Sequence, residues 1–132
     1  MQMLRGLIVL FSSIFVTAAF ADTQGVNFID IKDGDVVTSP FKVKFGVTGM
    51  SVAPAGETAV NTGHHHLLIN VEGVPVGGVV PADEKHIHFG KGQTETEVAL
   101  PSGKYTLTLQ FANGLHQSYG EVMRKSILIT VK

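Results

Sequence analysis

The regular alternation of apolar and polar residues is the main pattern along this chain. It is clearest in residues 41–47 and 105–111, where every second residue is apolar and most of the residues between are polar. A period of two predicts β-strands that bury one face and expose the other. Similar but shorter runs, bounded by turn-forming residues, predict further strands at 26–31, 63–71, 84–89, 94–100 and 126–131.

This succession of strands predicts an all-β protein. After the N-terminal segment, no stretch shows the period expected of an amphipathic helix, and turn signals recur between the strands. About seven short strands in this arrangement are typical of an immunoglobulin-like antiparallel β-sandwich. The chain has no cysteine and no tryptophan. The likeness to immunoglobulin domains is therefore one of architecture alone.

The first 21 residues have the features of an export signal. Arg5 precedes an uncharged apolar run over residues 6–20, and Ala19-Phe20-Ala21 fits a cleavage site with small residues at its ends. The run is shorter than the roughly 20 residues that span a bilayer, which disfavours the alternative of an uncleaved membrane anchor. We expect a cleavable signal peptide at 1–21, one domain at 22–132, and a periplasmic protein with no membrane association after cleavage.

Charge and composition limit the possible partners and sites. The chain has 10 basic and 11 acidic residues, for a formal net charge of −1. A nucleic-acid-binding protein needs a clearly basic surface, so no nucleic-acid partner is expected. The absence of cysteine excludes disulfides, thiolate metal sites and cysteine nucleophiles.

A long connection precedes the most unusual strand. Residues 49–63 are rich in Gly, Ala, Pro and Thr and show no strand or helix period. Most connections in compact domains are about 2–6 residues long, and longer ones tend to be functional or disordered. Because this connection leads directly into a histidine run, we favour a functional loop over a disordered surface excursion.

The six histidines are confined to the middle and late part of the chain, at 64, 65, 66, 86, 88 and 116. Successive side chains of a strand point to opposite faces. If Leu67 and Ile69 face the core, His65 faces it too, and His64 and His66 point outward. Leu68 is equally apolar, so the opposite phase remains possible.

The second histidine pair follows the same rule. Ile87 and Phe89 are the natural core residues of their strand, which places His86 and His88 together on the other face. Two His-x-His pairs on neighbouring strands would bring several imidazoles to one surface or loop-proximal site. Such a group suits zinc, which often takes three histidines and an open position, and also copper or nickel.

Seven residues are therefore candidate metal ligands. The primary ones are His64, His66, His86 and His88, and the secondary ones are His65, His116 and Met50. Methionine with histidine favours copper in an exported protein, although Met50 also suits a gap in the core.

Two other interpretations remain open for these histidines. They can be structural, with both ring nitrogens hydrogen-bonded, in a non-catalytic binding module of the cell envelope. They can also belong to a small metalloenzyme, for which Glu72, Asp83 and Glu84 are the acids close in sequence. No motif of a known catalytic site is present.

The chain also resembles a known family. The segments that carry the likeness are 45–50, the following Ala-Pro-Ala-Gly loop, Gly63–Ile69 and His86–Glu95. They are similar to short exported bacterial proteins grouped as domain of unknown function 4399, over nearly the whole mature chain. The resemblance implies a periplasmic single-domain protein and implies no activity.

We therefore expect a periplasmic protein that binds a transition-metal ion, copper first and zinc as the alternative. Metal handling or storage is expected rather than catalysis. Another periplasmic protein is a possible partner.

Overall fold

A computed structural model describes residues 12–16 and 23–132. The predicted signal peptide lies almost entirely outside these residues and stays a prediction. None of the helical structure in the described part is long and apolar enough to cross a bilayer. The strands and the short 3-10 helix η1 are β1 Gly25–Ile29, β2 Val36–Val37, β3 Phe41–Thr48, β4 Ser51–Val52, β5 Thr62–Ile69, β6 His86–His88, β7 Glu95–Val98, β8 Gly103–Ala112, η1 Glu121–Met123 and β9 Arg124–Val131.

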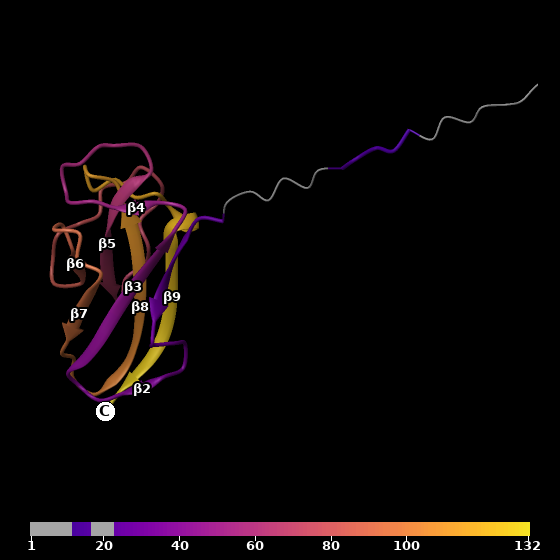
Figure 1. Cartoon of the computed structure of the whole chain (residues 1–132). Helices are drawn as coiled ribbons and strands as arrows, with labels where there is room; N and C mark the ends of the chain where they lie inside the picture. The colour runs from indigo at the N-terminus through magenta and orange to yellow at the C-terminus, as the bar shows by residue number, and fades with distance from the viewer. Residues whose placement is uncertain (1–11, 17–22) are drawn as a thin grey trace, which may run out of the picture.

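The strands form two sheets. One has the order β1-β3-β7, and the other has the order β2-β9-β8-β5-β4, with β6 also paired to β5. In Figure 1, β3 of the smaller sheet runs diagonally across β8 of the larger one. The all-β prediction is confirmed. The immunoglobulin-like topology stays a prediction.

The expectation of purely antiparallel pairing was wrong for two short strands. β2 pairs parallel to β9, and β4 pairs parallel to β5. A tight hairpin can join only antiparallel neighbours. β2 and β9 lie near opposite ends of the chain, and β4 is joined to β5 by the 53–61 loop. Neither pairing therefore depends on a hairpin.

The hydrophobic core lies between the two sheets. β3 contributes Phe41, Val43 and Phe45, which are the apolar positions of its alternating pattern. The larger sheet contributes its inward residues, namely Leu67, Ile69, Leu107, Leu109, Phe111, Ile127, Ile129 and Val131. The period-two prediction is therefore confirmed for β3, β5, β8 and β9.

The outer face of the larger sheet, turned away from this core, is also partly buried. Leu68 and Gln110 point to that face and are 0% exposed. The 71–85 connection lies over them: the Val74 amide donates to Gln110 Oε1, and the Val80 amide donates to the His116 carbonyl. We call residues 71–85 the cover segment. Its contacts show that this end of the sheet is buried on both faces.

Candidate metal centre

Strand β5 carries two buried histidines on the outer face of the larger sheet. His64 is opposite Ala112 of β8, while His66 is opposite Gln110 of β8 on one side and His88 of β6 on the other. Because His64 and His66 are two positions apart, their rings project from the same face of the strand. The ring centroids are 4.8 Å apart. The two rings thus form the floor of a site on the outer face of the larger sheet.

A third histidine comes from β6 and a fourth from the turn at 113–116. The turn is held by Asn113, whose Oδ1 accepts hydrogen bonds from the amides of Leu115 and Gln117. The His116 amide donates to the Asn113 carbonyl, and His116 has a φ of 64°. A left-handed backbone is uncommon for residues other than glycine. The turn thereby fixes the direction of the His116 ring toward His88.

The other three rings gather around His88. Nε2 of His88 lies 3.1 Å from Nε2 of His64 and 3.0 Å from Nε2 of His116. His64, His66 and His88 each offer a ring nitrogen within 4.8 Å of the others, which is close enough to hold one metal ion. The His116 ring centroid lies 5.0 Å from that of His64 and 6.0 Å from that of His66.

The solvent exposure of this group is uneven. His64 and His66 are 0% and 1% exposed, whereas His88 is exposed and His116 is half-buried. The group therefore has a buried side on β5 and an open side formed by His88 and His116. The group thus meets solvent at His88.

Burial keeps the inner rings neutral. Desolvation, with a smaller contribution from neighbouring histidines, lowers the pKa of His64 to about 4 and that of His66 to about 3. The pKa of His88 is also lowered, first by desolvation and then by the charge of His116. A metal ligand must present a free lone pair, which a protonated imidazole lacks. These histidines are therefore in the ligand-competent form at neutral pH.

The inner rings also have unused polar atoms. Nδ1 of His64 and both ring nitrogens of His66 are buried and have no hydrogen-bond partner among the described residues. A buried polar nitrogen without a partner costs about 1–3 kcal/mol. The structural interpretation, in which both nitrogens of each ring are hydrogen-bonded, does not match this environment. A bound cation would engage one nitrogen of each ring.

The nitrogen spacing agrees with a metal site. Nitrogens bound to zinc at about 2.0–2.1 Å in a tetrahedron lie roughly 3.3–3.4 Å apart. The square-planar arrangement preferred by Cu(II) brings adjacent nitrogens to roughly 2.8–3.0 Å at the same bond length. Nε2 of His88 lies 3.1 Å from Nε2 of His64 and 3.0 Å from Nε2 of His116, and these distances are close to the nitrogen–nitrogen distances of both geometries. Small ring adjustments would suit either ion.

His65 points to the opposite face of β5, as the strand phase predicted. Its ring lies in the core between Phe45 and Phe111, at centroid distances of 5.2 Å and 5.0 Å. Desolvation lowers its pKa to about 4, and neither of its ring nitrogens has a hydrogen-bond partner in the described part of the chain. His65 is thus a core residue, separated from the other rings by the sheet.

Two further candidates lie elsewhere. Nδ1 of His86 is 2.7 Å from Oδ1 of Asp83, the same oxygen that accepts hydrogen bonds from the amides of Lys85 and His86. The His86 hydrogen bond is the main cause that lowers the pKa of Asp83. Met50 packs against the hydrophobic core. The structure brings neither side chain into the group of four rings.

The prediction allowed a surface or a loop-proximal cluster, and the surface alternative was wrong for His64 and His66, which are buried. They lie on the predicted face. Their burial depends on packing between segments that are distant in sequence, which a strand pattern does not reveal. Sequence reasoning also missed Gln110, which lies opposite His66 and anchors the cover segment through Val74. The one feature of the sequence that could have indicated Gln110 is its polar side chain directly before the apolar residues Phe111 and Ala112 of β8.

The long 49–63 connection is tied to the same region. The Ala55 amide donates to the Gly90 carbonyl just after β6, and the Gly56 amide donates to the Gly114 carbonyl in the His116 turn. This loop therefore links the two segments that carry His88 and His116, and a functional role for it stays a prediction.

Comparison with known proteins identifies a family. A search of the curated proteins and a search of the solved structures found no match. A family model described as a domain of unknown function (DUF4399) matches residues 43–132. The matched region contains all six histidines and every strand that builds the site. The chain therefore belongs to the DUF4399 family.

Proposed function

We propose that this protein binds one transition-metal ion through His64, His66, His88 and His116, and that it handles or stores the metal rather than catalysing a reaction. The observation that carries the proposal is the convergence of four imidazoles from three segments, two of them buried and kept neutral. Three of the ligands form the compact group, and His116 completes it from the open side.

Copper is the proposed metal and zinc is the alternative. Imidazole binds both ions, and divalent copper forms the more stable complexes with a given nitrogen site. Among the residues that the structure describes, the site offers nitrogen donors only, because Met50 packs against the core and the Asp83 carboxylate is engaged by His86. This donor set supports divalent copper better than a metal that prefers oxygen ligands.

Export to the periplasm is part of the proposal. It is supported by the features of residues 1–21 and by the absence of cysteine, which leaves histidine as the strongest available ligand for copper. A metal-handling role would also require another periplasmic protein that delivers or receives the ion. The exposed side of His88 provides a point of exchange.

A non-catalytic role is proposed from the surroundings of the site. A metalloenzyme would need a general base close to the metal-bound water. Asp83 already accepts hydrogen bonds from His86 and two backbone amides, and Glu72 and Glu84 are exposed to solvent.

Elemental analysis tests the proposal. The protein would be purified from the periplasm without a histidine tag, and its metal content would be compared with that of H64A/H66A and H86A variants. We expect close to one equivalent of copper in the wild type and in H86A, and almost none in H64A/H66A. If the double variant loses thermal stability but the wild type carries no metal, the histidines are structural and the protein is a binding module of the cell envelope.

A further inference from the structure

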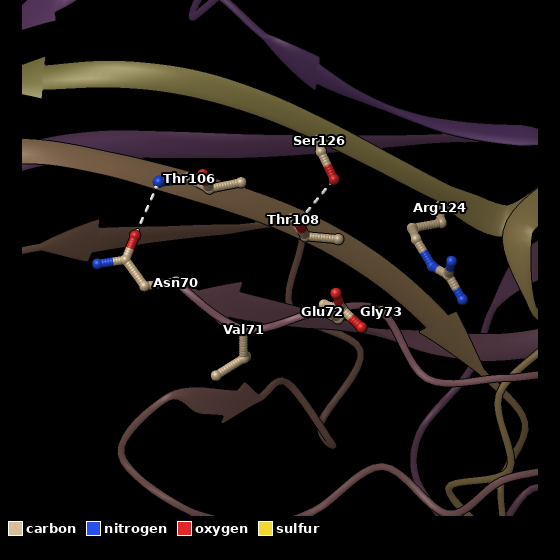
Figure 2. A pocket seen from close by; sticks show the side chains of 8 residues that line it. All are labelled: Asn70, Val71, Glu72, Gly73, Thr106, Thr108, Arg124 and Ser126. Carbon is tan, nitrogen blue, oxygen red and sulfur yellow. Dashed lines mark hydrogen bonds between the residues drawn. The ribbon is translucent and has the colours of Figure 1, made fainter.

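A polar pocket separate from the histidines lies on the outer face of the larger sheet. It has a volume of about 520 Å³, within the range of about 300–1,000 Å³ usual for small-molecule sites. β8 contributes Thr106 and Thr108, β9 contributes Arg124 and Ser126, and residues 70–73 form the opposite wall (Figure 2). No histidine lines this pocket, so the proposed metal site does not account for it.

Arg124 is held in a fixed position at one end. Its Nε donates to Gln110 Oε1 at 2.8 Å, and its Nη2 donates to the Val74 carbonyl at 2.7 Å. The guanidinium also lies against Gly73, where an added Cβ would come within 1.8 Å of Nε. Three separate contacts therefore place this cation before any ligand arrives.

The guanidinium charge has no anionic partner in the described residues. The ion pairs found there join Lys32 to Asp35, Lys44 to Asp30, and His86 to Asp83, and none includes Arg124. Arg124 is half-buried, and a partly desolvated charge is costly unless it is paired. A guanidinium has five N–H donors and binds a carboxylate with two parallel hydrogen bonds. The two protein contacts leave donors for such a ligand.

Neutral polar groups continue from Arg124 along the pocket. Thr108 Oγ1 and Ser126 Oγ are 2.7 Å apart, so one hydroxyl proton is shared between them and the other is free. At the far end, Asn70 Oδ1 accepts a hydrogen bond from the Thr106 amide, which leaves the Asn70 amino group free to donate. Figure 2 shows the hydroxyl pair between Asn70 and Arg124. This order suits a ligand with a carboxylate at one end and hydroxyls beyond it.

Glu72 limits the charge of that ligand. Its carboxylate is exposed and belongs to the pocket wall next to Gly73. A nearby negative charge disfavours a second negative charge on the ligand, while its oxygens can accept a hydrogen bond from a hydroxyl.

We propose that this pocket binds a small monoanionic hydroxy-carboxylic acid of the sugar-acid class. The carboxylate would bind Arg124, and the hydroxyls would bind the Thr108–Ser126 pair and Asn70. The site is independent of the metal, so the two proposals can fail separately.

NMR titration with D-glucuronate tests this site. Because sugar acids chelate metals, the protein would first be treated with a chelator and then dialysed. We expect saturable shifts of the Gly73 amide and the Arg124 Nε–H signal. R124Q should weaken binding roughly ten- to hundredfold, as expected for loss of a charged hydrogen-bonding partner. K125Q, the same charge change at the exposed neighbouring residue of β9, should bind like the wild type.

Further variants separate ligand binding from misfolding and from general charge effects. S126A leaves the guanidinium in place and should weaken glucuronate binding several-fold. D-glucose and inorganic phosphate should bind much more weakly than glucuronate, and E72Q should improve the binding of phosphate. The proposal is overturned if glucuronate gives no saturable shift, if glucose binds equally well, or if K125Q weakens binding as much as R124Q.

Discussion

Nε2 of His88 lies 3.0 Å from Nε2 of His116, although the two residues are 28 positions apart in the sequence. Nε2 of His64 lies on another side of the same His88 nitrogen, at 3.1 Å. One ring nitrogen carries at most one proton, so His88 Nε2 cannot donate to both neighbours. A metal ion among the rings would bind one nitrogen lone pair of each ring, and these lone pairs would then no longer face one another.

Replacing His116 by asparagine should weaken metal binding while preserving the fold. Asparagine tolerates the left-handed backbone that His116 adopts at φ 64°, but it removes the imidazole. We expect H116N to lower the affinity for Cu(II) by roughly tenfold or more. Replacing a residue that only hydrogen-bonds to a metal ligand already lowers metal affinity about 10–100-fold, and H116N removes a ligand itself. Competition with a chromophoric chelator would measure this change.

The control for this variant is H86A, which removes a histidine that contacts Asp83 instead of the cluster. It should leave the affinity unchanged. If H86A and H116N weaken metal binding equally, the proposed ligand set is wrong.

The metal-free protein should lose stability on mild acidification. In the unfolded chain, His64 and His66 bind protons below pH 6.5 or so, whereas in the folded protein their pKa values are about 4 and about 3. Between these limits the unfolded state binds more protons, so the free energy of unfolding falls as the pH falls. The loss is at most about 1.4 kcal/mol per pH unit for each histidine. Urea denaturation at pH 7.5, 6.0 and 4.5 would measure it.

An H66L variant should lessen this pH dependence by the share of one histidine, because leucine has no proton to bind; His64 and His65, whose pKa values are both about 4, keep the rest. H86A should retain the full dependence. Equal free energies of unfolding at pH 7.5 and pH 4.5 in the wild type would show that the inner histidines are not buried as described.

His65 should be dispensable for metal binding. Its ring lies in the core between Phe45 and Phe111, with two unpartnered nitrogens. Leucine removes these buried polar atoms and keeps much of the apolar volume, so H65L should be as stable as the wild type or more stable by about 1 kcal/mol. Its affinity for Cu(II) should not change. A loss of metal affinity in H65L with an intact fold would contradict the assignment of His65 to the core.

Local patterns in the sequence predicted the framework of the site. The alternation in 41–47 and 105–111 identified β3 and β8. The preferred phase of Leu67 and Ile69 placed His65 in the core and His64 with His66 on the other face, although Leu68 left the opposite phase open. These features depend on the period of a strand, which a single sequence displays. The family was also recognisable from the histidine segments.

The completion of the site was not predictable in the same way. His86 and His88 have the same spacing in the strand, yet Asp83 binds His86 and only His88 joins the cluster. His116 reaches the rings through a turn held by Asn113. The exclusion of His86 and the inclusion of His116 both depend on the conformation of loops. The alternation of apolar and polar residues does not predict loop conformation.

Bound metal should stabilise the fold. A ligand that binds only the folded state at a free concentration one hundred times its Kd adds about 2.7 kcal/mol. We expect one equivalent of Cu(II) or Zn(II) to raise the melting temperature of the wild type but not of H64A/H66A. A rise of equal size in both proteins would indicate binding at some other place on the surface.

NMR spectroscopy of the histidine rings tests the central claim most directly. Protein without a tag, labelled with ¹⁵N in its histidines, would be titrated with Zn(II), which is diamagnetic. We predict that one equivalent shifts the ring nitrogens of His64, His66, His88 and His116 together and leaves those of His65 and His86 unchanged. Unshifted rings at His64 and His66 after one equivalent of Zn(II) would contradict the existence of a shared metal site.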